Sequence, residues 1–295
     1  MASWQHRAIV RVPTAPRVDL TGKTVVVTGA ADGSIGGETA RILSAWGADV
    51  TITTRSRRPT LTGVDWHPLD LTDRQSVKDF AAWYDRDRLD VLVNNGGVHL
   101  DLMGSWKEPH RDAEGHELHW RTNYLGTMHL TDLLLPRLER SEDARIVNVV
   151  SKLHTRGTNA ELFEGQAKYS SWTAYGLSKL ALVHATKEQQ TRYAPGGVQS
   201  FALHPGEVYT DIATKGLAEH RAVGAIRKAL KPVEAFFLMT AEEGAQTSVY
   251  VASQPGLQGG RYFAKCAEKE PSPEVADSAA AARLWDQTQS WVRAQ

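Results

Sequence analysis

Short apolar runs alternate along the chain with segments that have a helical spacing of hydrophobic residues. The runs are hydrophobic or β-branched throughout, as strands covered on both faces should be; they are TVVVT (24–28), VTITT (50–54), VLV (91–93), RIVNVV (145–150) and VQSFAL (198–203). Between them the spacing predicts helices over about residues 37–46, 74–84, 116–138 and 171–193. This order predicts an α/β fold with a doubly wound parallel sheet and helices on both faces.

Length and composition fit one domain of this kind. The chain has 295 residues, of which 41% are hydrophobic and 23% charged, as is ordinary for a globular protein. We expect an N-terminal extension over residues 1–19 and a single domain over residues 20–295. The segment 271–292 is expected to form a terminal helix after a Pro-rich turn. The apolar run in the extension is only three residues long and two prolines follow it, so we expect neither a signal peptide nor an integral membrane segment.

The balance of charge and the few metal-binding side chains exclude several functions. With 34 basic and 34 acidic side chains, the formal net charge is zero, and we expect no nucleic-acid partner. A single cysteine, Cys266, forms no internal disulfide and indicates a reducing, cytoplasmic location. His110, His116 and His119 are close in sequence, but no acid or cysteine cluster with ligand spacing accompanies them, so we expect no metal.

The first predicted strand leads into the glycine-rich stretch TGAADGSIGGE, where Gly29, Gly33 and Gly36 do not have the spacing G-x-G-x-x-G. A doubly wound sheet binds dinucleotides at this point, because glycines let the backbone approach phosphate and the next helix offers unpaired N–H groups. Taken alone, the stretch is equally typical of a plain strand–helix turn. Ser34 either adds a hydroxyl to a phosphate or caps the helix that begins at Ile35.

Further motifs follow in order. They are HPLDLTD with Asp70, NNGG at 94–97, HWRTNYLG with Asn123, RIVNVVS ending at Ser151, Y-x-x-x-K from Tyr175 to Lys179, and HPG at 204–206. With the glycine loop they resemble the short-chain dehydrogenase/reductase family over about residues 20–265, and the tail and the IGGETA segment resemble its retinol-dehydrogenase-like branch. The family loop reads T-G-x-x-x-G-x-G, so this chain departs from it by one inserted residue, Ser34.

The resemblance implies a single-domain Rossmann-type fold and a set of site residues. It implies that the catalytic residues are Asn123, Ser151, Tyr175 and Lys179. It implies that the cofactor-binding residues are Gly29, Gly33, Ser34, Ile35, Gly36, Thr54, Arg55, Asp70, Leu71, Asn95, Gly96, Tyr175, Lys179, Pro205, Gly206, Val208 and Thr210. It also implies that the helices carrying Asn123 and Tyr175 pair across a two-fold axis, so we expect a homodimer or homotetramer.

The Tyr–Lys pair suits proton transfer during carbonyl reduction. Hydride transfer to a carbonyl makes an alkoxide that needs a proton, and a free tyrosine, with a pKa of about 10, is a poor base at neutral pH. Tyr175 and Lys179 lie four residues apart, on one face of a helix. We therefore expect the ammonium to lower the pKa of the tyrosine, which then serves as acid or base. In isolation, a surface Tyr–Lys pair is the alternative.

The end of the second predicted strand indicates which cofactor is bound. NAD enzymes carry an acid there for the ribose, but this chain has Thr54 followed by Arg55-Ser56-Arg57-Arg58. Arginine suits a phosphate, because its guanidinium makes two parallel hydrogen bonds. The sequence therefore predicts NADP(H), with a solvated basic turn as the alternative.

The substrate site is less specified. Ser151 and Tyr175 are 24 residues apart, and the residues between them are expected to form a lid or wall. Leu153 and Trp172 are candidates for the pocket, although core packing explains Trp172 equally well. Residues 207–235 fall where the family has its substrate lid. Two interpretations of their basic side chains are open: contact with a membrane surface or, more simply, a solvated helix face.

We expect an NADP(H)-dependent alcohol dehydrogenase or carbonyl reductase that interconverts a ketone or aldehyde and an alcohol on a small or medium hydrophobic substrate. An enoyl reductase of the same superfamily is disfavoured, since Leu182 stands where its lysine would be. The alternative from another class is a non-catalytic NADP-binding regulator or scaffold. Its only support is the altered glycine loop. The four polar residues implied to be catalytic speak against it, because a regulator has no need of a proton relay.

Overall fold

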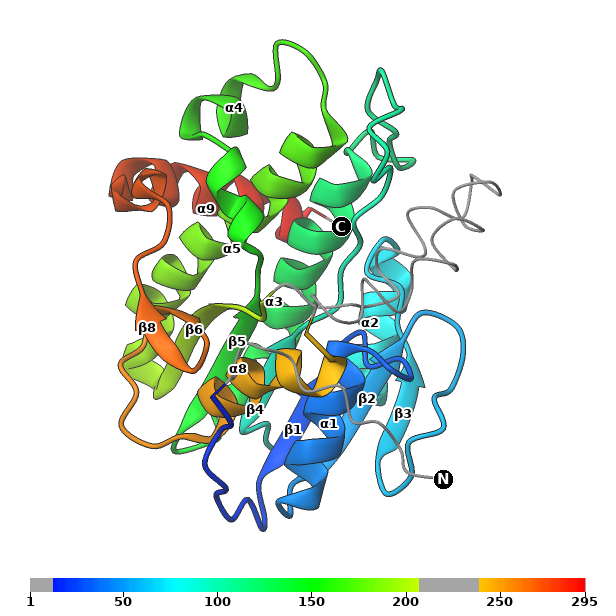
Figure 1. Ribbon diagram of the computed structural model, residues 1–295, viewed down its shortest axis with the longest axis vertical. Helices are drawn as coiled ribbons and strands as arrows, with labels where there is room; N and C mark the ends of the chain where they lie inside the picture. The colour runs from blue at the N-terminus through cyan, green and yellow to red at the C-terminus, as the bar shows by residue number, and fades with distance from the viewer. Residues whose placement is uncertain (1–12, 207–238, 295) are drawn as a thin grey trace, which may run out of the picture.

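A mostly parallel sheet forms the centre of the molecule. The structure, a computed structural model, describes residues 13–206 and 239–294 (Figure 1). Within them an eight-stranded sheet has the order β3-β2-β1-β4-β5-β6-β7-β8. Its strands are β1 (Thr24–Val27), β2 (Asp49–Thr54), β3 (Asp65–Pro68), β4 (Val91–Asn94), β5 (Ala144–Val149), β6 (Val198–His204), β7 (Tyr262–Ala264) and β8 (Ala267–Lys269). All neighbours from β3 to β7 are parallel, and β8 is antiparallel to β7. The predicted doubly wound sheet is confirmed.

Helices cover both faces of this sheet. On one face lie α1 (Ile35–Ala45) and α8 (Ala241–Ser253), packed side by side (Figure 1). The other face carries α2 (Arg74–Trp83), the π-helix η1 (Trp120–Leu125), α3 (Gly126–Leu138) and α5 (Ser171–Tyr193). The last helix, α9 (Ser278–Arg293), packs on α3 and α5.

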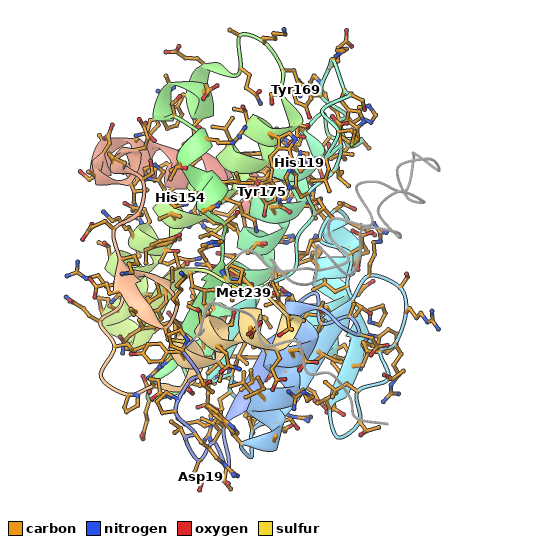
Figure 2. All side chains as sticks on the ribbon, in the orientation of Figure 1. Asp19, His119, His154, Tyr169, Tyr175 and Met239 are labelled. Carbon is orange, nitrogen blue, oxygen red and sulfur yellow. The ribbon has the colours of Figure 1, made fainter. Side chains whose placement is uncertain are left out.

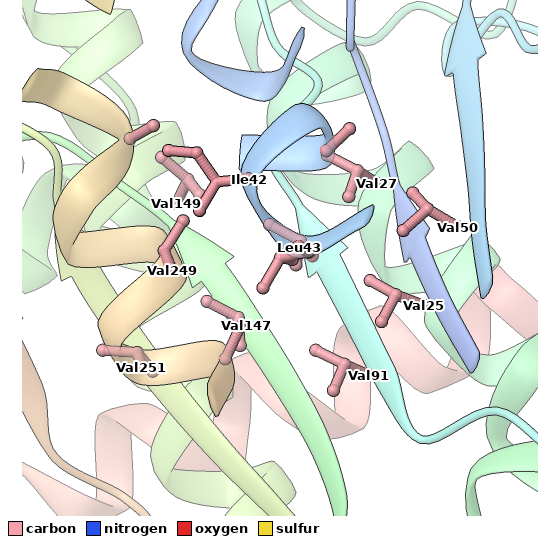
Figure 3. Close-up of a cluster of buried hydrophobic side chains, with 14 of the residues drawn as sticks. Val25, Val27, Ile42, Leu43, Val50, Val91, Val147, Val149, Val249 and Val251 are labelled. Carbon is pink, nitrogen blue, oxygen red and sulfur yellow. The ribbon is translucent and has the colours of Figure 1, made fainter. Parts of the chain in front are cut away.

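The core is built from the continuous apolar runs of the strands. Figure 3 shows Val25, Val27, Val91 and Val147 of the sheet facing helix side chains that include Leu43. A strand whose side chains alternate between two covered faces must be apolar at every position. This explains why the strands were recognisable in the sequence without an alternating pattern.

Several boundaries differ from the predictions. The helix predicted over 171–193 is confirmed to the residue, but the one predicted over 116–138 begins at Trp120 and its first six residues are π-helical. The terminal helix after a Pro-rich turn, predicted over 271–292, is confirmed as the 3-10 turn η4 (Pro273–Ala276) followed by α9. Among the strands and α-helices of the described residues, the apolar pattern missed β3, β7, β8, α4 (Asn159–Glu164) and α8.

Part of the predicted N-terminal extension packs against the domain. Ala15 is buried, and its N–H donates to Gln246 Oε1 of α8 at 3.0 Å. The predicted lid over residues 207–235 lies outside the described residues, as do Val208 and Thr210. In the ranges that are described, no helix combines the length and the hydropathy needed to cross a membrane.

Candidate active site

The glycine loop and the turn after β4 meet at the point where the strand order reverses. β1 pairs with β2 on one side and β4 on the other, so the chain leaves the carboxyl ends of β1 and β4 in opposite directions. Asn95 Nδ2 donates to Thr28 O at 2.9 Å and to Gly29 O at 3.2 Å. Gly29 has φ +68°, and a Cβ there would lie 2.7 Å from Gly96 Cα. The loop therefore needs glycine for its own packing as well as for access by a ligand.

Ser34, the inserted residue, caps α1. Its hydroxyl accepts from Gly37 N–H at 3.0 Å and donates to Ala31 O at 2.7 Å. The capping alternative is therefore confirmed, and Ile35 begins the helix as a core residue. A phosphate contact by Ser34 stays a prediction.

The end of β2 carries exposed arginines beside a buried threonine. Thr54 is 8% exposed, and its hydroxyl accepts from Trp66 Nε1 at 2.9 Å and donates to Arg57 O at 2.6 Å. The side chains of Arg55, Arg57 and Arg58 are exposed. Thr54 thus shapes the turn, and the arginines on it face solvent.

The turn after β3 is held by Asp70 and Leu71. Asp70 Oδ1 accepts from Thr72 N–H at 2.9 Å and from Thr72 Oγ1 at 2.6 Å. The carbonyl of Leu71 accepts from Arg121 Nη1 at 2.8 Å, which ties this turn to η1.

Asn123 joins the turn after β4 to α5. It is fully buried in the π-helix; its Oδ1 accepts from Val98 N–H at 2.7 Å, and its Nδ2 donates to Val98 O at 2.9 Å and to Ser178 Oγ at 3.1 Å. Short π-helical segments are rare and are frequent at functional sites. Here the π-turn places the asparagine side chain between two segments that are distant in sequence.

Lys179 is a buried cation beside the end of β5. Its side chain is on α5, the residue is 5% exposed, and Nζ donates to Val149 O at 3.0 Å. Burial lowers the pKa of Lys179 to about 8. An ammonium group has three hydrogens, and the carbonyl of Val149 takes one. Donors therefore remain for another acceptor at this position.

Tyr175 lies beside Ser151. Burial raises the pKa of Tyr175 to about 12, and the Ser151 hydroxyl acts in the opposite direction. The expectation of a pKa below the ordinary value is wrong for this arrangement, because burial outweighs the effects that lower the pKa. The structure does bring the predicted Ser–Tyr pair together.

Rings surround Tyr175. His99 is stacked on it, with centroids 4.1 Å apart and planes 12° apart, and His119 meets its edge at 6.0 Å and 81°. Trp172, a pocket candidate, meets the edge of His99 at 4.6 Å and donates from Nε1 to Leu102 O at 3.2 Å. Figure 2 shows His119 and Tyr175 in one region of the molecule.

The remaining predicted residues border this region. The N–H of Leu153 donates to Ser151 Oγ at 3.2 Å, so Leu153 begins the segment that leaves the site. Pro205 and Gly206 follow β6, and Gly206 has φ +102°. Both lie at the carboxyl edge of the sheet, the same edge as the glycine loop.

The comparisons with known proteins identify the family. The family model for short chain dehydrogenases matches residues 23–221. The chain belongs to the short-chain dehydrogenase family. It is therefore an oxidoreductase of the kind that uses a nicotinamide cofactor.

The relatives narrow the branch. This short-chain dehydrogenase is 37% identical to retinol dehydrogenase 12 of Homo sapiens over 286 residues, which cover 91% of this chain and 86% of that protein. It is 35% identical to dehydrogenase/reductase SDR family member 13 of Bos taurus, over 93% of this chain and 74% of that one. A solved structure of an uncharacterized protein from Mycobacterium paratuberculosis is 31% identical, with a TM-score of 0.72 and coverage of 93% and 95%. The predicted retinol-dehydrogenase-like branch is confirmed.

Sequence reasoning about this dehydrogenase missed His99. Its only signal was its position two residues after Gly97, at the end of the NNGG motif. His119, considered above as a metal ligand, instead faces Glu117 Oε1 through Nδ1 at 2.7 Å and accepts from Leu100 N–H through Nε2 at 2.8 Å. In the part of the chain that the structure describes, no group of three or more His, Cys, Asp and Glu is arranged to hold a metal ion.

Proposed function

We propose that this protein is an NADP(H)-dependent oxidoreductase that interconverts a ketone or aldehyde and an alcohol on a small or medium hydrophobic substrate. The observation that carries the proposal is the position of Tyr175, buried beside Ser151 and with the ammonium of Lys179 5.7 Å from its ring centroid. Tyr175 is the acid–base residue and Ser151 orients the carbonyl. Lys179 holds the nicotinamide ribose, and Asn123 belongs to the proton relay.

The protonation states support reduction at neutral pH. With a pKa raised to about 12, Tyr175 keeps its proton and can donate it to an alkoxide. With a pKa lowered to about 8, Lys179 still carries its charge at pH 7 and stabilises the phenolate that results. When bound, the nicotinamide supplies hydride to the carbonyl carbon or takes it from the alcohol.

The residues present fit a dinucleotide. The glycine loop opens directly into α1, whose first N–H groups favour phosphate. The hydrogens of Lys179 that Val149 does not take are available to ribose hydroxyls. Exposed Arg55 at the end of β2, with no acid at Thr54, supports NADP(H) over NAD.

The regulator or scaffold alternative is not favoured. Its support was the altered glycine loop, yet the inserted Ser34 is absorbed as a helix cap while Asn95 still holds the loop. We retain the cytoplasmic location in the proposal, supported by the single cysteine.

The proposal is tested by nicotinamide absorbance with a panel of ketones, aldehydes and alcohols. Retinaldehyde is included because close relatives are named retinol dehydrogenases. In Tyr175→Phe, which removes one hydroxyl, we expect turnover to fall by roughly 10² or more, the scale of lost acid–base catalysis. Cofactor binding, measured by fluorescence, is expected to stay. Near-normal turnover in this variant removes Tyr175 from the mechanism, and no absorbance change with any member of the panel contradicts the proposed reaction.

A further inference from the structure

His99 lies flat against the residue proposed to move the proton. Its ring centroid is 4.1 Å from that of Tyr175, with the planes 12° apart. Trp172 meets His99 edge-on at 4.6 Å, and His119 meets it at 6.0 Å and 70°. An imidazole held by three rings has a defined orientation, so its nitrogens have defined positions close to the phenol.

One of those nitrogens has no partner. His99 is 7% exposed, and among the described residues its Nε2 makes no hydrogen bond. A buried polar atom without a partner carries a free-energy penalty, which a ligand group relieves when it binds. Neighbouring His119 differs, because both of its nitrogens are engaged.

Other buried histidines show that position is what distinguishes His99. Nδ1 of His129 and Nδ1 of His184 are also without partners. The ring of His129, however, faces Trp291 of α9, and His184 Nε2 pairs with Asn159 Oδ1 of α4 at 2.8 Å. Of these three, only His99 stacks on Tyr175.

We propose that His99 is a substrate-recognition residue whose Nε2 hydrogen-bonds an uncharged hydroxyl or carbonyl that the substrate carries next to the reacting carbon. The proposal rests on the function proposed above and specifies its substrate class. The group lies next to the reacting carbon because His99 stacks on the ring whose hydroxyl meets the carbonyl oxygen. A site built to hydrogen-bond a substrate hydroxyl rejects the analogue that lacks it, since its own polar atom then stays unpaired.

The charge state of His99 selects an uncharged group. Burial lowers the pKa of His99 to about 3, so the ring is neutral and offers one N–H and one lone pair. A neutral ring has no charge with which to compensate a buried carboxylate. A hydroxyl or a carbonyl matches it without that penalty.

The test compares an α-hydroxyketone with the ketone in which a methyl group replaces the hydroxyl, each reduced with NADPH. For the wild-type protein we expect kcat/KM to be about tenfold or more higher for the hydroxyketone, as one buried hydrogen bond implies. His99→Phe keeps a ring against Tyr175 but has no nitrogen, so the two ketones should be reduced alike. His99→Leu, which has no polar atom either, should also lose the preference.

The control is His67→Phe, which makes the same exchange on β3, where the ring of His67 contacts Trp83 of α2. It should keep the wild-type preference. Cofactor titration of each variant reports on folding, so a variant that binds no cofactor is replaced by the other His99 variant.

The outcomes separate failure of the proposed function from failure of the assignment of His99. A wild-type protein that binds NADPH but reduces neither ketone nor any carbonyl of the panel overturns the proposed function, and the assignment of His99 with it. If the wild-type protein reduces both ketones with the same kcat/KM, only the assignment of His99 is overturned. A preference that survives in both His99 variants overturns the assignment as well. If kcat for both ketones falls by the same factor in the His99 variants, the assignment is also overturned, because His99 would then only support Tyr175.

Discussion

Arg55 is the residue on which the choice of cofactor depends. Its guanidinium is exposed at the end of β2, and a charge-assisted hydrogen bond to a phosphate contributes about 1.5–3 kcal/mol. We expect Arg55→Ala to weaken NADPH binding by roughly ten- to a hundredfold and to leave NADH nearly unchanged, since NADH has no 2′-phosphate. Fluorescence titration of both cofactors at fixed ionic strength measures this.

Arg140→Ala is the matched control, because it removes the same charge beside Asp87 after α3. It should change neither affinity. If the wild-type protein binds NADH as tightly as NADPH, the arginines form only a solvated turn. Thr54→Asp is a poor test of cofactor choice, because it also removes the bonds of the Thr54 hydroxyl to Trp66 and Arg57.

At the scale of residues, the spacing of side chains along the sequence identified the candidate catalytic pair but not its burial or its neighbours in the fold. Tyr175 and Lys179 were recognisable because both lie on one helix at a local spacing. The pKa of Tyr175 was predicted in the wrong direction, because it depends on burial by segments distant in sequence. His99 was missed for the same reason, since its contacts with Tyr175 and Trp172 exist only after the chain has folded.

The start of α1 is where an inserted residue changes an element. The hydroxyl of Ser34 accepts from Gly37 N–H, so Ser34→Ala should lower the free energy of unfolding by about 1 kcal/mol, as loss of an N-cap does. Ser34→Asp keeps the acceptor that caps the helix but loses the donation to Ala31 O, so its stability should fall between those of Ser34→Ala and the wild-type protein. Urea unfolding measures both.

The same pair of variants tests the phosphate contact. If the hydroxyl of Ser34 meets a cofactor phosphate, Ser34→Asp weakens NADPH binding by charge repulsion although the fold is intact. Unchanged NADPH affinity in Ser34→Asp shows that the insertion serves the helix alone. Equal stability of Ser34→Ala and the wild-type protein contradicts the capping role.

The central strands were predictable because they are apolar or β-branched throughout, so no alternating pattern was needed. Helix α5 was predicted to the residue. The π-helix Trp120–Leu125 was not, because its hydrogen bonding depends on where Asn123 must lie. Helix α8 packs Val249 and Val251 into the core but also buries the polar run at residues 246–248, so its apolar positions are interrupted. Strands β7 and β8 have three residues each, too few to show a period.

For the whole molecule, buried histidines predict sensitivity to acid. Burial lowers the pKa of both His129 and His184 to about 4, against about 6.5 in an unfolded chain. Below pH 6.5 the unfolded chain therefore binds more protons than the folded one. The stability these groups contribute is fully present above pH 6.5 and is lost progressively as pH falls toward 4. The slope is about 1.4 kcal/mol per pH unit for each histidine.

Urea unfolding at pH 7, 6 and 5 measures this slope. In His129→Leu the slope should be smaller by the contribution of one histidine, about 1.4 kcal/mol per pH unit, because leucine does not titrate. A free energy of unfolding that stays constant from pH 7 to 5 contradicts the prediction, as does an unchanged slope in the variant.

The last helix decides how copies of the chain can associate. The sequence predicted a homodimer or homotetramer formed through the helices that carry Asn123 and Tyr175. In the structure α9 packs on α3 and α5, with Trp285 buried and Tyr124 OH hydrogen-bonded to Thr288 Oγ1 at 2.8 Å. A surface covered by the chain's own helix is not available to a second copy, so the predicted route to an oligomer is blocked while α9 stays in place.

We therefore predict a monomer in light scattering at micromolar concentration. Trp285→Glu places a charge in the buried face of α9, at a cost of several kcal/mol, and should detach the helix and expose the apolar surface below it. That variant is expected to associate, whereas Gln287→Glu, at an exposed position of the same helix, stays monomeric. Circular dichroism separates detachment of one helix from global unfolding. A wild-type protein with the mass of two or four chains contradicts the prediction, and its interface must then lie on another surface.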